Sequence, residues 1–192
     1  MDKPTFSGKE EIKFEGKTFQ IISQPWNFGG KAKTLERARR SPGVRLIIAK
    51  SNKLLLTKEY RMELNDYDYR LPGGKVFDSL EEYKDALESG KDMLEYAAEA
   101  AKKECLEETG IAARKTKHFQ TTNAGQTIVW DLYYFIVEDF EEKGQNPGFD
   151  EEIYPEWKTF EEVKELCRQS KISEDRSLGV LFRYFILNNV LK

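Results

Sequence analysis

The amino-acid sequence predicts a layered domain of the α/β or α+β class. Two apolar runs, residues 44–49 and 53–60, flank a Ser-Asn turn and predict a β-hairpin. A third strand-like run covers residues 126–137. Helical patterns lie between these runs and after them. Strands and helices in this order favour a sheet that is covered by helices.

The composition limits the function. The 192 residues carry 31 Lys and Arg against 34 Asp and Glu, a net charge of only −3, and 39% are hydrophobic. This balance argues against nucleic acid or a membrane surface as the main partner. Two cysteines are too few for a disulfide scaffold or a structural zinc site. The chain starts without an apolar leader and has no long apolar run, so we expect a soluble cytoplasmic protein.

The first 40 residues predict short strands, with Gly16 at the turn of a hairpin. Their large apolar side chains need burial that so short a segment cannot supply by itself. These side chains are Phe14, Phe19, Ile21, Ile22 and Trp26.

Capping signals define two helices in the middle of the chain. Ser79 with Glu82 predicts a helix start, and Gly90 a stop, with Leu80, Tyr83 and Leu87 on the packed face. The second helix is expected over residues 93–109, between Asp92 and Gly110. A polar loop over 141–156 and two C-terminal helices, about 160–169 and 176–191, complete the prediction.

The second helix carries three acids on one stripe. Glu104, Glu107 and Glu108 occupy positions i, i+3 and i+4, next to an apolar stripe that includes Ala101 and Cys105. Like charges at this spacing destabilise a bare helix, and a divalent cation would remove the repulsion. Mg²⁺ prefers such carboxylate oxygens. The simpler alternative is a solvated glutamate-rich helix face.

The segment from Lys103 to Ile111, KECLEETGI, closely resembles the second half of the Nudix box, R-E-U-x-E-E-x-G-U. Glu95 lies at the spacing that the box requires, and Leu71–Lys75, LPGGK, resembles its opening turn. Three further segments resemble the ADP-ribose diphosphatase-like branch. They are ERARR at 36–40, KEYR at 58–61 and GFDEEI at 148–153.

The resemblance implies a Nudix fold, in which a mixed β-sheet is layered between helices. It implies a Nudix domain over residues 41–192 and an N-terminal antiparallel β extension over residues 1–40. The extension is expected to pair two subunits into a homodimer. It implies Mg²⁺-dependent hydrolysis, with Mn²⁺ as a substitute, of a nucleoside diphosphate linked to another moiety, such as ADP-ribose or a nucleotide sugar. Two alternatives remain open: a non-catalytic nucleotide-binding module and a pyrophosphatase that sanitises the nucleotide pool.

The resemblance also implies the site residues. The metal set is Gly74 through its carbonyl and the acids Glu95, Glu104, Glu107 and Glu108, although Glu95 fits a helix-capping role equally well. A late-loop glutamate, Glu151 or Glu152, is the expected base, with Glu107 and Lys103 as further catalytic positions. The expected substrate contacts are Arg39, Arg40, Arg61 and Tyr69.

Two features depart from the family pattern. Twenty residues separate Gly74 from Glu95, a much longer stretch than the usual box has. The extra residues predict an inserted helix at about 76–91 that borders the phosphate site. Lys103 replaces the usual arginine, which keeps the charge and loses the planar fork that orients carboxylates. Both departures favour the non-catalytic alternative.

Overall fold

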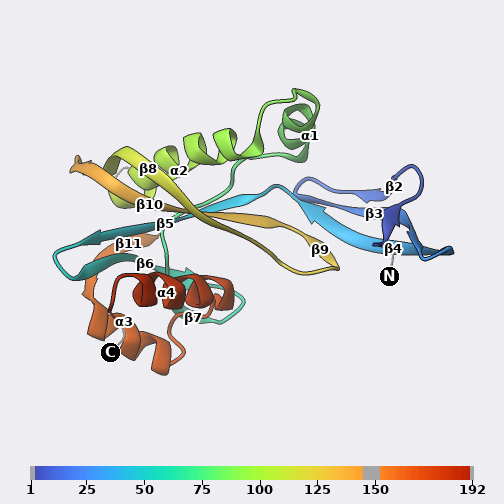
Figure 1. The fold of residues 1–192 in the computed structure, drawn as a ribbon. Helices are drawn as coiled ribbons and strands as arrows, with labels where there is room; N and C mark the ends of the chain where they lie inside the picture. Colours follow the sequence, from blue (N-terminus) through green and yellow to red (C-terminus); the bar gives the residue numbers. More distant parts are fainter. Residues whose placement is uncertain (1–2, 145–151, 191–192) are drawn as a thin grey trace.

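The computed structural model describes residues 3–144 and 152–190 as two β-sheets and four helices (Figure 1). The smaller sheet contains the N-terminal strands and extends to one side of the larger sheet, which is covered by helices on both faces. The predicted mixed sheet between helices is therefore confirmed.

The smaller sheet is built almost entirely from residues 5–40. Its strands β1 (Thr5–Phe6), β2 (Glu11–Glu15), β3 (Phe19–Phe28) and β4 (Lys31–Arg40) are antiparallel, with β3 between β2 and β4. The hairpin expected at Gly16 joins β2 to β3. A two-residue strand from much later in the chain, β9 (Ile128–Val129), adds to β4 in parallel.

The larger sheet has the order β11-β6-β5-β10-β8, with β7 beside β6. It combines β5 (Gly43–Lys50), β6 (Lys53–Arg61), β7 (Asp66–Arg70), β8 (Ile111–Asn123), β10 (Asp131–Glu142) and β11 (Ile153–Thr159). β5 and β10 are parallel, whereas the other pairs are antiparallel. The sequence prediction missed β7 and β11 and placed a loop where β11 begins. β7 buries the charged Asp68 rather than its tyrosines, and β11 is mostly half-buried and carries Glu156 and Lys158, so neither strand has the alternating buried apolar face that marks a strand.

Alternation along the central strand β5 assigns its residues to two layers. Val44, Leu46 and Ile48 pack on one face with helix α2, and Ile47 packs on the other with the C-terminal helices. All four side chains are fully buried. Arg45, between two core residues, therefore points to the same side as Ile47, toward α4.

Helix α2 (Met93–Thr109) begins and ends where the capping signals predict. Asp92 accepts a hydrogen bond from the Leu94 N–H at 3.0 Å, and Gly110 closes the helix with φ of 70°. Ala97, Ala101 and Cys105 form its buried stripe, while Leu94 and Ala98 are only partly buried.

The inserted helix is present as α1 (Leu80–Glu88), capped by Ser79. Its buried residues are Leu80 and Ala86, and Leu87 is exposed. The expected packing of Leu87 is thus wrong, because the helix turns the smaller Ala86 inward. α1 lies between the start of α2 and the N-terminal sheet (Figure 1), and Lys84 forms an ion pair with Glu15 of β2.

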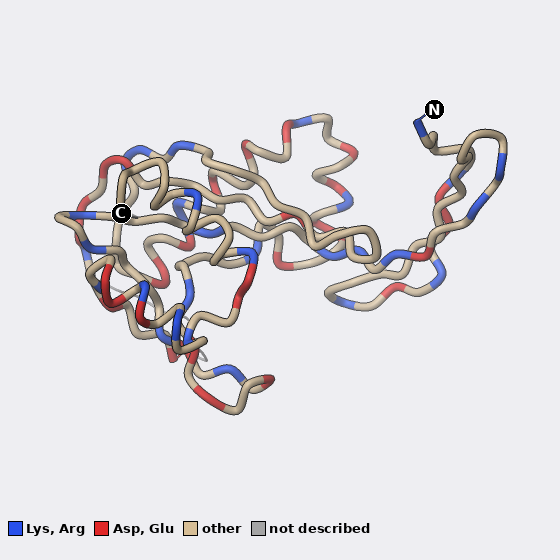
Figure 2. Tube along the Cα trace, turned by 60° about the horizontal axis from the view of Figure 1, so that its bottom comes forward, with Lys and Arg blue, Asp and Glu red and all other residues tan. Residues whose placement is uncertain are grey.

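Two helices close the opposite face of the larger sheet. They are α3 (Phe160–Arg168), with a complete capping box at Thr159 and Glu162, and α4 (Asp175–Leu187), which ends a few residues earlier than predicted. No helix among the described residues is both long and apolar enough to cross a membrane. Acidic and basic residues are interspersed over the whole trace (Figure 2), in keeping with the small net charge.

Candidate active site

The site is built around the turn at Gly73 and Gly74, which follows β7 and lies beside the start of β5. Gly73 has φ of +142°, and a Cβ atom there would lie 2.2 Å from the Val44 carbonyl oxygen, so only glycine fits. The Val44 N–H donates to the Gly74 carbonyl at 2.9 Å, and the Leu46 N–H donates to the Pro72 carbonyl at 2.8 Å. The turn is thereby fixed against the edge of β5.

Two glutamates of α2 close on this turn. Glu108 accepts a hydrogen bond from the Gly73 N–H at 2.7 Å. A Cβ atom on Gly74 would lie 2.5 Å from the Glu104 carboxylate. The missing side chain at Gly74 is therefore what allows the Glu104 carboxylate to lie against the backbone.

The Glu108 carboxyl has an unusual electrostatic environment. Burial raises its pKa to about 8 from an ordinary value of 4.5. The Gly73 N–H and Arg45 oppose this rise, whereas the charges of Glu104 and Glu59 reinforce it. A buried carboxyl with a raised pKa beside a second acid gains from a bound cation, which stabilises the ionised form.

Arg45 connects the turn to helix α4. Its guanidinium donates to the Gly73 carbonyl at 2.9 Å and to the Glu174 carboxylate at 3.1 Å. Glu174 also accepts from the Ser177 hydroxyl at 2.6 Å, and the Arg45 charge helps to keep the pKa of Glu174 low despite burial. Arg45 thus binds the carbonyl oxygen of Gly73, while Glu108 binds the N–H of the same residue.

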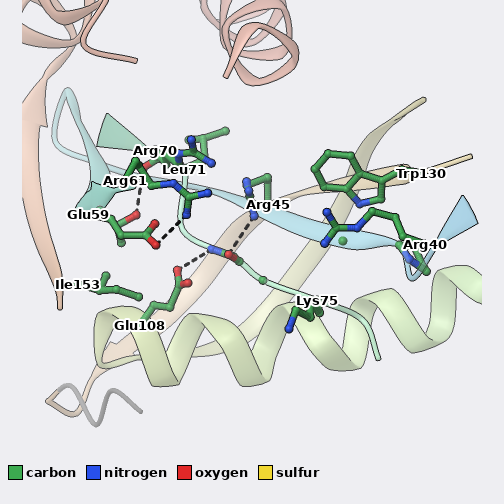
Figure 3. Close-up of a pocket in the computed structure, with 15 residues that line it drawn as sticks. Arg40, Arg45, Glu59, Arg61, Arg70, Leu71, Lys75, Glu108, Trp130 and Ile153 are labelled. Carbon is green, nitrogen blue, oxygen red and sulfur yellow. Dashed lines mark hydrogen bonds and ion pairs between the residues drawn. The ribbon is translucent and has the colours of Figure 1, made fainter. Parts of the chain in front are cut away.

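A pocket of about 310 Å³ opens over the turn (Figure 3). Figure 3 shows Glu59 and Glu108 toward one end, Arg40 and Trp130 at the other, and the turn with Arg45 between them. The charged side chains that line it are Arg40, Arg45, Glu59, Arg61, Arg70, Lys75 and Glu108. A pocket with this excess of cations next to a carboxylate pair suits a polyanion together with a metal ion.

The structure brings several predicted site residues together. Gly74, Glu108, Arg40 and Arg61 line the pocket, and Glu104 lies against its glycine turn. Arg61 is held by Glu59 at 2.9 Å and by Glu63 at 2.8 Å.

Other predicted residues lie elsewhere. Glu107 and Lys103 face each other on the partly exposed side of α2, with 3.9 Å between Glu107 Oε2 and Lys103 Nζ. Glu95 is exposed in the first turn of α2, where it faces Lys91 at 3.9 Å. Arg39 forms a bidentate ion pair with Glu10 of the N-terminal segment.

Three further residues also stand apart from the pocket lining. Tyr69 donates to Glu156 at 3.3 Å and packs against the core. Glu152 is exposed, immediately before Ile153, which lines the pocket. Glu151 lies outside the described residues. The inserted helix α1 contributes no residue to the pocket lining, which ends at Lys75 on that side.

Sequence reasoning missed Arg45, Glu59 and Trp130 as pocket residues. Arg45 had a recognisable signal, since a charged residue in the middle of the apolar run 44–49 needs a buried partner. Glu59 lies in the KEYR segment next to Arg61 and was identifiable only through the pairing of β6 with β11. Nothing local marks Trp130, because α4 and β4 approach it from distant parts of the chain.

The donor set fits a hard divalent cation. Glu104 and Glu108 supply carboxylate oxygens on either side of the turn, and the Gly74 carbonyl has a second lone pair beyond its bond to Val44. Within residues 3–144 and 152–190, no three acidic, histidine or cysteine side chains form a ready-made cage. A Mg²⁺ ion held here would complete its shell with water and phosphate oxygens, as this ion commonly does.

Comparison with known proteins agrees with this geometry. A model of the NUDIX domain matches residues 39–177, and the chain therefore belongs to the Nudix family. The class that the domain and the pocket define is a Nudix pyrophosphohydrolase.

Among 151 matching chains of solved structures is one described as an ADP compounds hydrolase. It superposes with a TM-score of 0.71 at 18% identity, covering 98% of this chain and 97% of its own. At 18% identity, this similarity shows only that the two proteins share a fold. No curated protein matches the sequence.

We predict that Gly74→Ala displaces the Glu104 carboxylate and lowers the affinity for Mg²⁺ or Mn²⁺ at least about tenfold, because the new Cβ would occupy its position. Isothermal titration calorimetry with each metal measures this effect. Gly179→Ala is the matched control: that glycine lies in α4, and a Cβ atom added there would have no neighbour within 4 Å, so metal affinity stays unchanged. Equal affinities in the two variants would contradict the assignment.

A second prediction concerns pH in the absence of metal. Since folding raises the pKa of Glu108 from 4.5 to about 8, the folded protein binds the proton more tightly than the unfolded chain. The contribution of Glu108 to the free energy of unfolding therefore decreases as pH rises from 4.5 to about 8.

Glu108→Gln should accordingly become more stable relative to the parent between about pH 5 and about pH 9 in the presence of EDTA. Chemical denaturation across this range measures the difference. Exposed Glu95→Gln serves as control and should show a nearly constant offset. A constant offset for Glu108→Gln as well would refute the raised pKa.

Proposed function

We propose that this protein hydrolyses, with Mg²⁺ as cofactor and Mn²⁺ as a substitute, the diphosphate bond of a nucleoside diphosphate linked to another moiety. One observation carries the proposal: Glu104 and Glu108 of the box helix meet the Gly73–Gly74 turn beside an arginine-rich pocket. The products are a nucleoside monophosphate and a phosphorylated second moiety.

A bound divalent cation would supply a more acidic water and neutralise phosphate charge. Around it, this chain's own residues have distinct tasks. Glu104, Glu108 and the Gly74 carbonyl would hold the ion, and Arg61 and Arg70 at the pocket wall would orient phosphate oxygens. Arg45 stabilises the turn through its hydrogen bond to the Gly73 carbonyl oxygen. Glu152, which directly precedes the lining residue Ile153 in the sequence, or Glu151 accepts the proton of the attacking water.

For the substrate, we infer ADP-ribose or a nucleotide sugar. The segments at 36–40, 58–61 and 148–153 support this branch, and the structurally similar protein is described as an ADP compounds hydrolase. A non-catalytic binding module is the second candidate, favoured by Lys103 in place of arginine and by its exposed position facing Glu107. Release of nucleoside monophosphate with Mg²⁺, and its absence with EDTA, would separate the two. We place the protein in the cytoplasm.

The metal assignment predicts that Glu108→Gln or Glu104→Gln lowers turnover at least about 100-fold, since each removes a carboxylate charge at the Gly73–Gly74 turn. The rate is measured at saturating Mg²⁺ with the best substrate of a panel of nucleotide sugars, dinucleoside polyphosphates and triphosphates. Glu99→Gln, one exposed acid on the same helix, is the control and should keep the parent rate. Parent-like rates in both of the first two variants would refute the metal site.

We further predict a homodimer that forms through the N-terminal sheet. Phe6, Ile12, Phe14 and Phe19 each expose close to half of their surface there, which is a large apolar area for a monomer. Light scattering at micromolar concentration should give twice the chain mass of 22.4 kDa. Ile12→Lys together with Phe14→Lys should shift the mass toward one chain, whereas a monomeric parent would contradict the prediction.

A further inference from the structure

Two guanidinium groups share one indole ring at the basic end of the pocket. Arg40 Cζ lies 4.4 Å from the Trp130 ring centroid, and Arg176 Cζ lies 4.0 Å from it. Arg176 also donates to the Trp130 carbonyl at 3.2 Å. Arginine stacks well on aromatic faces, and tryptophan is the strongest partner for a cation. Two like charges are thereby held close together.

Three separate elements produce this arrangement. Arg40 ends β4, Trp130 lies between β9 and β10, and Arg176 is in the first turn of α4. The parallel pairing of β4 with β9 matches Arg39 with Val129, so the next residues along the two strands, Arg40 and Trp130, come side by side. The start of α4 then adds the second guanidinium.

These cations differ from the other arginines of the pocket. Arg45, Arg61 and Arg70 each form an ion pair with an acid. Neither Arg40 nor Arg176 has such a partner in the described part of the chain. Burial, followed by repulsion from Arg176 and Arg45, lowers the pKa of Arg40. The repulsion makes an anion at this place favourable.

A third cation and the glycine turn border the same place. Lys75 lines the pocket and forms a backbone bridge with Gly43, and it too has no ion pair within the described ranges. A Cβ atom on Gly43 would lie 3.1 Å from the Gly74 carbonyl oxygen and 3.6 Å from Trp130 Nε1. The tryptophan edge is thus next to the turn that holds the metal ligands. Its buried Nε1 has no hydrogen-bond partner among the described residues.

We propose that Arg40, Lys75 and Arg176, arranged around Trp130, form a second anion-binding position for a phosphate group of the substrate. This position lies beside the Gly73–Gly74 turn, on the side away from Glu59 and Glu108 (Figure 3). Arg40 and Lys75 contact the phosphate. Arg176 is a positioning residue, since it stacks on the ring and keeps the local potential positive.

The inference rests on the proposed function where it concerns the substrate. It selects, among diphosphate compounds, those that carry a further phosphate on the second moiety or in a longer phosphate chain. A neutral sugar would leave two or three cations unpaired next to the turn, whereas a phosphate satisfies them with charge-assisted hydrogen bonds. The position therefore favours the more highly phosphorylated member of a substrate pair.

Trp130 provides a direct readout of binding. In a parent with Trp26→Phe and Trp157→Phe, Trp130 is the single tryptophan of the chain. Inorganic phosphate is titrated in the presence of EDTA at constant ionic strength, so that neither metal nor hydrolysis contributes. We expect a saturable change of Trp130 fluorescence.

The variants test which side chains bind the phosphate. Arg40→Gln should weaken phosphate binding at least about tenfold, and Lys75→Gln at least about threefold. Lys75 is exposed, so its variant keeps the fold even if Arg40→Gln does not. Arg183→Gln is the control, because it removes the same charge from an exposed position two turns further along α4. The affinity of Arg183→Gln for inorganic phosphate should equal that of the parent.

No saturable response in the parent, or an equal loss in Arg183→Gln, overturns the anion position. The substrate inference has its own measurement, the ratio of kcat/KM for a nucleoside diphosphate sugar with and without a phosphate on the sugar. This ratio should fall at least about threefold in Lys75→Gln, and an unchanged ratio refutes the selectivity. If neither compound is hydrolysed, the proposed function fails, while the phosphate titration still decides the anion position.

Discussion

The close contact between the carboxylates of α2 and the Gly73–Gly74 turn is the constraint on which the site depends. Glu108 accepts the Gly73 N–H at 2.7 Å, and the Glu104 carboxylate occupies the place of a Cβ on Gly74. The contact brings two acids into a poorly hydrated position, which raises the pKa of Glu108 to about 8. It is a costly arrangement for the free protein and a suitable one for a bound cation.

The larger sheet and its helices support this contact from two directions. On one face of the sheet, the apolar stripe of α2 packs against Val44, Leu46 and Ile48. This packing fixes the position of the glutamates of α2. On the other face, Arg45 donates to the Gly73 carbonyl and to Glu174, the residue that precedes α4. Because the side chains of a strand alternate, β5 connects the turn to both helical layers. The same strand also places Gly43 beside Trp130.

The two ends of the pocket differ in net charge because the arginines are paired with acids at one end only. At the end near Glu59 and Glu108, acids balance Arg61, whereas at the Trp130 end two arginines have an aromatic ring in place of an acid. The inserted helix contributes no residue to the pocket lining and contacts the N-terminal sheet through Lys84 and Glu15. The inserted helix is therefore associated with the N-terminal sheet rather than with the pocket.

The sequence by itself determined the local features of this protein: α2 and its caps, the three glutamates, the glycine turn, and the family to which they belong. These depend on capping, periodicity and backbone conformation within a few residues. Only the tertiary structure decided which charges meet. Glu104 and Glu108 reach the turn while Glu107 faces Lys103, and Arg40 enters the pocket while Arg39 pairs with Glu10. The physical reason is that neighbouring residues share a pattern but point in different directions, and the partners of each come from strands and helices that are distant in the sequence.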